Sequence, residues 1–177
     1  AATIDGASAG VGLLTITGGT HDLNADIGVI NHLATITVAG DTSEFAEEVH
    51  ATTLTITGDA TAFAKAIGVD TITQVAGTTA YDGIITNEAG TGSATLVIDD
   101  AAGQSVADFG KAGTYKVNTT VQADSEGEVN TTIDAVVIDG SIGTSAALIA
   151  DIDIDGTATI NGDIFADLTH VVNSKVL

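Results

Sequence analysis

The sequence predicts a mainly β protein: a repetitive β-solenoid-like stack of units of about 20 residues, with short helical turns. In residues 34–40 (ATITVAG) and 53–58 (TLTITG), threonine alternates with apolar residues, a period of two that is typical of a half-buried strand. Each run ends in glycine, and a Phe-Ala pair follows five residues later in both units. The closing glycines are 22, 18 and 19 residues apart, at Gly18, Gly40, Gly58 and Gly77.

The first unit shows the same alternation over residues 14–17, and Leu23 stands where the next two units have phenylalanine. In the second unit, Ile36 and Val38 point to one side of the strand and the threonines point to the other. A single unit cannot bury its apolar side, whereas stacked units form one continuous core. We therefore expect each threonine row to lie beside the row of the next unit, where threonine neighbours stabilise a sheet.

Short helices are expected after the closing glycines. Asp41 and Glu44 have the spacing of a capping box, and residues 43–51 (SEFAEEVHA) place Phe45 and Val49 on one helical face. The corresponding segments of later units are residues 60–67 (ATAFAKAI) and 104–113 (QSVADFGKAG).

The repeat weakens after Gly77. Residues 114–140 predict a hairpin with an exposed acidic loop at 124–128. The tail recovers the motif, and the apolar residues 171–177 predict a terminal strand for subunit contacts.

No linker divides the chain, so we expect a single β-rich domain over residues 1–177, with residues 1–12 as an extended N-terminal arm. The less repetitive second half favours an alternative fold, a β-sandwich or jelly roll like that of pilus-like subunits.

The composition limits the partners. The chain carries 24 acidic residues against 4 lysines, a net charge of −20. Such a surface repels phosphate groups, which argues against nucleic acid and anionic membrane surfaces as partners. No run approaches the roughly 18 apolar residues that a membrane span needs. Cysteine is absent, which excludes disulfides and thiolate metal sites. Ala1-Ala2 suits the residues left by cleavage at a signal site, so we expect a secreted or cell-surface protein.

The most specific motif for chemistry is DIDIDG at residues 151–156. Alternate aspartates followed by glycine begin a calcium loop, because they place carboxylates around a hard cation. The twelfth position is Gly162 rather than the usual glutamate, and Asp163 follows it. The alternative is a strand with isoleucine inward and aspartate outward, turning at 155–156. The candidate calcium ligands are Asp151, Asp153, Asp155 and Asp163.

Thr-x-Thr pairs in successive units form a second candidate site. Their spacing within each strand resembles the ice-binding face of solenoid antifreeze proteins, which implies a binding module. The alternative is a solvated strand face, for which threonine is a common residue. The candidate binding residues are Thr15, Thr17, Thr35, Thr37, Thr55, Thr57, Thr71 and Thr73.

A catalytic function is not expected. The four histidines lie at separate places in the repeat, which indicates surface residues rather than ligands of one metal. No serine lies in a nucleophile-elbow sequence, and there is no thiol and no phosphate-binding glycine loop with lysine. An enzyme acting on polysaccharide with paired carboxylates remains the alternative.

The segments LTITGDATAFAKAI (54–67), ATITVAGD (34–41) and TATINGD (157–163) resemble repeat regions of bacterial surface-layer proteins and related secreted adhesins. The resemblance implies a calcium-dependent β-solenoid or β-sandwich that assembles outside the cell. We therefore expect an extracellular structural protein that assembles with itself into a surface layer, filament or matrix, assisted by calcium, with a cell-surface polysaccharide as a further candidate partner. The alternative is a binding module, an adhesin or an ice-binding domain.

Overall fold

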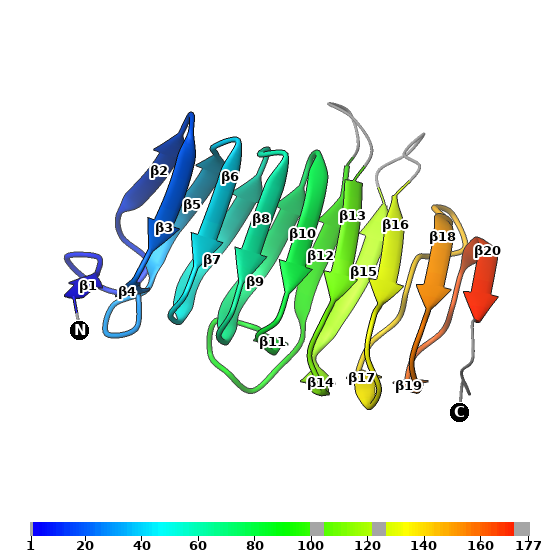
Figure 1. The fold of residues 1–177 in the computed structure, drawn as a ribbon. Coiled ribbons are helices and arrows are strands. Elements are labelled where there is room, and N and C mark those ends of the chain that lie inside the picture. The colour runs from blue at the N-terminus through cyan, green and yellow to red at the C-terminus, as the bar shows by residue number, and fades with distance from the viewer. Residues whose placement is uncertain (1, 100–104, 122–126, 172–177) are drawn as a thin grey trace.

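The computed structural model describes residues 2–99, 105–121 and 127–171, which form strands and no helix. The chain winds into a parallel β-solenoid of about seven turns, with residues 2–4 and 166–171 at opposite ends (Figure 1). The mainly β solenoid predicted from the sequence is thus confirmed. In the described part of the chain every pair of named strands is parallel, as stacked turns require and as a sandwich built of hairpins would not allow.

We distinguish three faces of the solenoid. The first face consists of β2 (Leu13–Thr17), β5 (Leu33–Ala39), β7 (Val49–Ile56), β9 (Ile67–Gln74), β12 (Ala94–Ile98) and β15 (Val117–Val121). The second face is the eight-stranded sheet of β3 (Thr20–Leu23), β6 (Thr42–Phe45), β8 (Ala60–Phe63), β10 (Gly77–Tyr81), β13 (Ser105–Phe109), β16 (Glu128–Thr131), β18 (Ile149–Ile154) and β20 (Ala166–Val171).

The third face begins with short strands that pair with the first residues of β7 and β9, so that these two long strands take part in two faces. It continues as a separate three-stranded sheet. Its strands are β1 (Ala2–Ile4), β4 (Ala25–Ile27), β11 (Ile85–Thr86), β14 (Gly113–Tyr115), β17 (Val136–Ile138) and β19 (Ala158–Ile160). Residues 2–4, at the start of the expected N-terminal arm, pair with β4 as β1.

The short helices predicted from the sequence are wrong. Residues 43–51 belong to β6 and the start of β7, and residues 60–67 contain β8. Phe45 and Val49 are both buried, as the helical spacing predicted, but they lie on strands that turn a corner at residues 46–48. Backbone groups there pair with neighbouring turns, as when the N–H of Ala64 donates to the carbonyl of Phe45 at 2.9 Å. The third expected helix corresponds to β13 and β14 in its described part.

The hairpin predicted within residues 114–140 is also wrong. β15 pairs with β12 on the first face, whereas β16 pairs with β13 on the second face. Each strand therefore pairs with the turn before it rather than with its neighbour in sequence. The acidic residues 124–126 lie outside the described part of the chain, as do residues 172–177 of the predicted terminal strand. The rest of that terminal strand, residue 171, ends β20.

The core consists of inward-pointing ladders, one residue from each turn. On the second face, Leu23, Phe45, Phe63 and Tyr81 occupy equivalent positions, and successive turns advance the chain by 22, 18 and 18 residues. The next turn, to Phe109, takes 28 residues because it contains the 87–93 loop and the 100–104 segment. The period of about 20 therefore holds in the first half and lengthens where the sequence repeat weakens.

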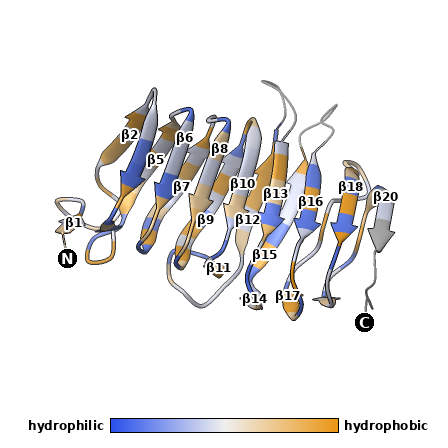
Figure 2. Ribbon diagram, viewed as in Figure 1, coloured by the Kyte–Doolittle hydropathy of each residue, from blue (hydrophilic) through white to orange (hydrophobic). Residues whose placement is uncertain are grey.

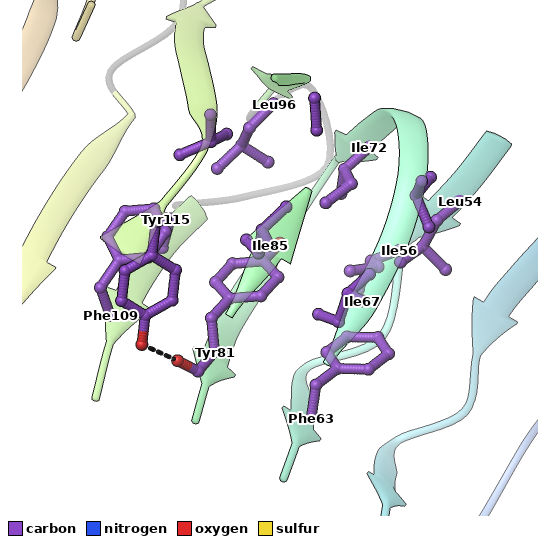
Figure 3. Packing of buried hydrophobic residues seen from close by; sticks show 14 of the residues in the cluster. Leu54, Ile56, Phe63, Ile67, Ile72, Tyr81, Ile85, Leu96, Phe109 and Tyr115 are labelled. Carbon is purple, nitrogen blue, oxygen red and sulfur yellow. Dashed lines mark hydrogen bonds between the residues drawn. The ribbon is translucent and has the colours of Figure 1, made fainter. Parts of the chain in front are cut away.

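Aromatic rings stack along this ladder. The ring of Phe63 lies 4.7 Å from that of Phe45 and 5.9 Å from that of Tyr81, nearly parallel to both. Phe109 continues the stack, and Tyr115 of β14 meets it edge-on at 4.8 Å. Figure 3 shows the rings of Phe63, Tyr81, Phe109 and Tyr115 on one side of the core. Leu54, Ile72 and Leu96 of the first face lie on the other. The core is thin and filled mainly by Ile, Leu and Val, as the small content of aromatic residues requires.

The closing glycines allow the turns to approach each other. A Cβ atom at Gly58 would collide with the carbonyl oxygen of Gly40 in the preceding turn. Gly77 adopts a φ of 72° and lies against the backbone of Asp59. Glycine therefore recurs in the sequence because the backbones of successive turns are in contact at these positions.

Candidate functional site

Six of the eight predicted threonines lie on the outer side of the first face, in two columns that run along the solenoid. One column contains Thr15, Thr37, Thr55 and Thr73, each beside the next in register. It ends in Val97 and Thr120. The expectation that threonine rows stack beside one another is confirmed for these residues.

A second column runs beside the first. It contains Leu13, Thr35, Thr53, Thr71, Thr95 and Asn118 in register. Sequence analysis missed Thr53 and Thr95, although each begins a Thr-x-Thr or Thr-x-Val alternation. Two predicted residues, Thr17 and Thr57, fall in neither column: Thr17 pairs with Ala39, and the N–H of Thr57 donates to the carbonyl of Val38. Each predicted Thr-x-Thr pair is thus displaced by two residues along the strand relative to the predicted pair of the next turn.

The two columns form an uncharged grid. Parallel strands place neighbours in a column about 4.8 Å apart and residues two apart on a strand about 6.6 Å apart. Thr15 is exposed and Thr37, Thr55 and Thr73 are half-buried, so side chains stand close together along the column. No member of either column carries a charge, although the chain has a net charge of −20. The carboxylates are therefore concentrated elsewhere on the surface.

The aspartates of the candidate calcium loop lie on a strand. Asp151 and Asp153 are in β18, while Ile152 and Ile154 between them are buried. The segment therefore adopts the strand alternative, with Asp155 at the turn that follows. Asp151 lies beside Glu128 of β16.

The structure does not bring the four candidate ligands together. Asp163 precedes Ile164, which bridges to Ile142 in continuation of the first face, whereas Asp151 and Asp153 lie on the second face. The N–H of Asp163 donates to Oγ of Ser141 at 3.2 Å. Within the three described ranges, no group of three His, Cys, Asp or Glu side chains is placed to hold a metal ion.

Carboxylates gather at the two ends of the second face. One outward column reads Asp22, Glu44, Ala62, Ala80, Asp108, Asn130 and Asp153 in register. Figure 2 shows blue hydrophilic residues on β3, β6, β16 and β18, with paler β8 and β10 between them. A shallow hollow of about 260 Å³ lies over this central part, lined mainly by small side chains of β6, β8 and β10. Glu44 is the ionisable side chain of this lining, which otherwise consists of alanine, serine and threonine.

Asp108 is a half-buried carboxyl of this column. Burial raises its pKa above the usual value, and the nearby negative charge of Asp82 raises it further. A hydrogen bond from Oγ1 of Thr132 to Oδ1 of Asp108, 3.2 Å long, opposes the shift. A cation that approaches this face therefore stabilises the ionised form of Asp108.

The described histidines make separate local contacts, as expected for surface residues. His32 pairs with Glu88 at 2.8 Å, and His50 lies 3.7 Å from Glu48. His21 contacts the carbonyl of Gly18 in its own turn. The contact between His32 and Glu88 joins the 28–32 loop to the 87–93 loop. Its role is therefore to hold a corner of the solenoid together rather than to form a reactive centre.

The chain matches no protein-family model, no curated protein and no solved structure. The described residues include no helix long and apolar enough to cross a membrane. Function must therefore be argued from the geometry of the solenoid.

Proposed function

We propose that the protein is an extracellular structural protein that assembles with copies of itself into a filament, layer or matrix. One observation carries the proposal: among the described residues, the strands at the N-terminal end have unpaired edges. In that part of the chain, β1, β2 and β3 each pair with another strand on one side only. Unpaired backbone groups along such an edge favour pairing with another strand.

Exposed aliphatic side chains surround the same end. Leu13 is 69 % exposed and Ile30 is 74 % exposed. Ile4, Val11 and Val29 are also exposed, and all five belong to the first turn. Several large apolar side chains grouped on one surface are typical of an interaction site.

Charge opposes this assembly and cations favour it. Each copy carries a net charge of −20, so copies repel one another at low ionic strength. Calcium or another divalent cation between acidic faces would reduce the repulsion without a dedicated binding site. In this proposal calcium acts mainly as a counter-ion, and Asp151 and Asp153 contribute to the field that attracts it.

The test compares two substitutions that add the same charge. Leu13→Asp adds a carboxylate on the first described turn, whereas Ile84→Asp adds one at a 39 %-exposed position in the middle of the third face. Light scattering across a concentration series should show assembly of the parent and of Ile84→Asp, and much weaker assembly of Leu13→Asp. A parent that stays monomeric at high concentration with millimolar calcium contradicts the proposal.

The threonine grid favours a second candidate function, binding to an ordered surface such as ice. Its regular spacing and lack of charge are the observations that support it. Thr55→Tyr, in the centre of the grid, should abolish thermal hysteresis, whereas Thr78→Tyr on the second face should leave it unchanged. An absence of thermal hysteresis in the parent protein removes the ice-binding version of this function.

A further inference from the structure

The uncharged part of the first face is wider than the threonine grid. Residues that lie two positions further along the strands than the first column form a third row beside it. The row consists of Thr17, Ala39, Thr57 and Val75. No member of this row carries a charge, and the row continues to a carboxylate, Asp99, whose N–H donates to the carbonyl of Gln74. We call the grid and this third row together the uncharged surface.

Carboxylates border the uncharged surface on two sides. Asp41 and Asp59 are exposed at the corner where β5 and β7 turn towards the second face. Asp70 is exposed in β9, directly before the first grid residue of that strand. An uncharged centre with a charged, solvent-accessible rim is typical of a surface that contacts another protein.

The size of the uncharged surface suits a small interface. Its six strands lie about 4.8 Å apart and its rows about 6.6 Å apart, which gives about 500 Å² per copy. Two such surfaces in contact would bury about 1,000 Å² in total, the smallest area expected of a specific protein–protein interface. The expected contact is therefore weak and depends on protein concentration.

A second copy of the chain is the partner whose surface has the matching period. Rows of side chains on an identical surface have the same spacing, so the side chains of one copy fit between the rows of the other. Repulsion favours the same arrangement. The acidic column with Asp22, Glu44 and Asp153 lies on the second face, across the core (Figure 3). Contact through the first faces therefore directs these carboxylates away from the other copy.

We propose that two copies of this chain pair face to face through their uncharged surfaces. This inference rests on the proposed self-assembly and adds a second contact surface, on the side of the solenoid, to the unpaired strand edges. Because the same surface takes part on both copies, the pair has two-fold symmetry and closes as a dimer. Pairing covers the threonine grid that an ordered surface such as ice would also contact, so the two partners compete.

Sedimentation across a concentration series, at physiological ionic strength, tests the pairing. Ile30→Asp places a carboxylate on the first turn outside the uncharged surface, whereas Leu13 begins one of the grid columns and so takes part in both contacts. The Ile30→Asp variant should form dimers and no larger species. Adding Thr55→Asp, in the centre of the grid, should weaken these dimers at least about tenfold, because like charges meet in the contact. Adding Thr78→Asp instead, at an exposed position of the second face, is the matched control and should leave them unchanged.

A charge pair distinguishes loss of the contact from loss of the fold. Position 55 lies at the centre of both surfaces, so opposite charges there attract across the contact. In the Ile30→Asp background, Thr55→Asp mixed with Thr55→Lys should dimerise about tenfold more tightly than either variant alone. A variant that had merely lost its fold would gain nothing from the mixture.

The outcomes separate this contact from the proposed function. Dimers that Thr55→Asp weakens and the charge pair restores support the face-to-face contact. An Ile30→Asp variant that stays monomeric overturns the contact, and assembly of the parent then leaves the proposed function standing. Species of any size that Thr55→Asp leaves unchanged also overturn it, as does thermal hysteresis of a monomeric parent, which assigns the surface to ice. A parent that stays monomeric under every condition contradicts both proposals.

Discussion

The stacking of Phe45 on Phe63 provides a direct test of the turn register. Their ring centroids are 4.7 Å apart with an interplanar angle of 14°, and both side chains are 1 % exposed. We replace each phenylalanine with leucine, singly and together. Leucine retains an apolar side chain, so each single change should cost about 1–2 kcal/mol in the free energy of unfolding.

The two changes should not be additive. An aromatic pair contributes about 0.5–1.5 kcal/mol beyond the area that it buries, and each single substitution already removes that contribution. The double variant should therefore lose about 0.5–1.5 kcal/mol less than the sum of the single losses. Phe45 and Phe109 are the matched control, since Phe63 and Tyr81 lie between them in the stack. That pair should be additive within about 0.5 kcal/mol.

Urea unfolding followed by far-ultraviolet circular dichroism measures these differences. The slope of the transition must stay constant across the variants, because the comparison assumes that the same surface is exposed on unfolding. Additivity of Phe45 with Phe63, or equal coupling of Phe45 with Phe109, would refute the parallel register of the second face.

Two further predictions concern pH and salt. Burial raises the pKa of Tyr115 from 10.0 to about 12, and its hydroxyl donates to the carbonyl of Tyr81 at 2.7 Å. Between these values the unfolded chain has lost the proton that the folded chain keeps, so stability falls as pH rises, by about 3 kcal/mol for this group. Tyr115→Phe should be less stable at pH 7, and its deficit should shrink towards pH 12; a constant deficit contradicts the assignment. Assembly should increase from 0.1 M to 1 M sodium chloride, since the screening length falls from about 10 Å to about 3 Å. Calcium and magnesium should promote it alike. A response to calcium alone that Asp151→Asn abolishes would instead support the calcium ligands predicted from the sequence.

The architecture was predictable because its repeat appears in the residues that make contact between turns. Gly40 and Gly58 recur in the sequence because they allow the backbones of neighbouring turns to come close. Phe45 and Phe63 recur because their rings stack. The helices could not be excluded from the sequence, because Phe45 and Val49 have a spacing that suits a helix as well as two strands around a corner. Their conformation depends on hydrogen bonds to other turns, which local sequence does not encode.

The candidate sites were less predictable. The Thr-x-Thr pairs identified an outward face of the solenoid, but their register depends on the number of residues in each turn. The 28–32 loop of the first turn has no counterpart between Val49 and Ala51 in the second, so these turns advance by 22 and 18 residues. The first three predicted pairs are 20 residues apart, so Thr35 lies beside Thr53 rather than beside a member of the next predicted pair. The aspartates of residues 151–155 fit both a calcium loop and a strand, and the buried Ile152 and Ile154 decide for the strand.

Electron microscopy of the protein in high salt tests self-assembly most directly. Pairing through the unpaired strand edges of the described first turn predicts filaments or layers much larger than one molecule. Leu13→Asp should shorten or abolish the filaments. Separate particles of monomer size at every protein and salt concentration would contradict the account.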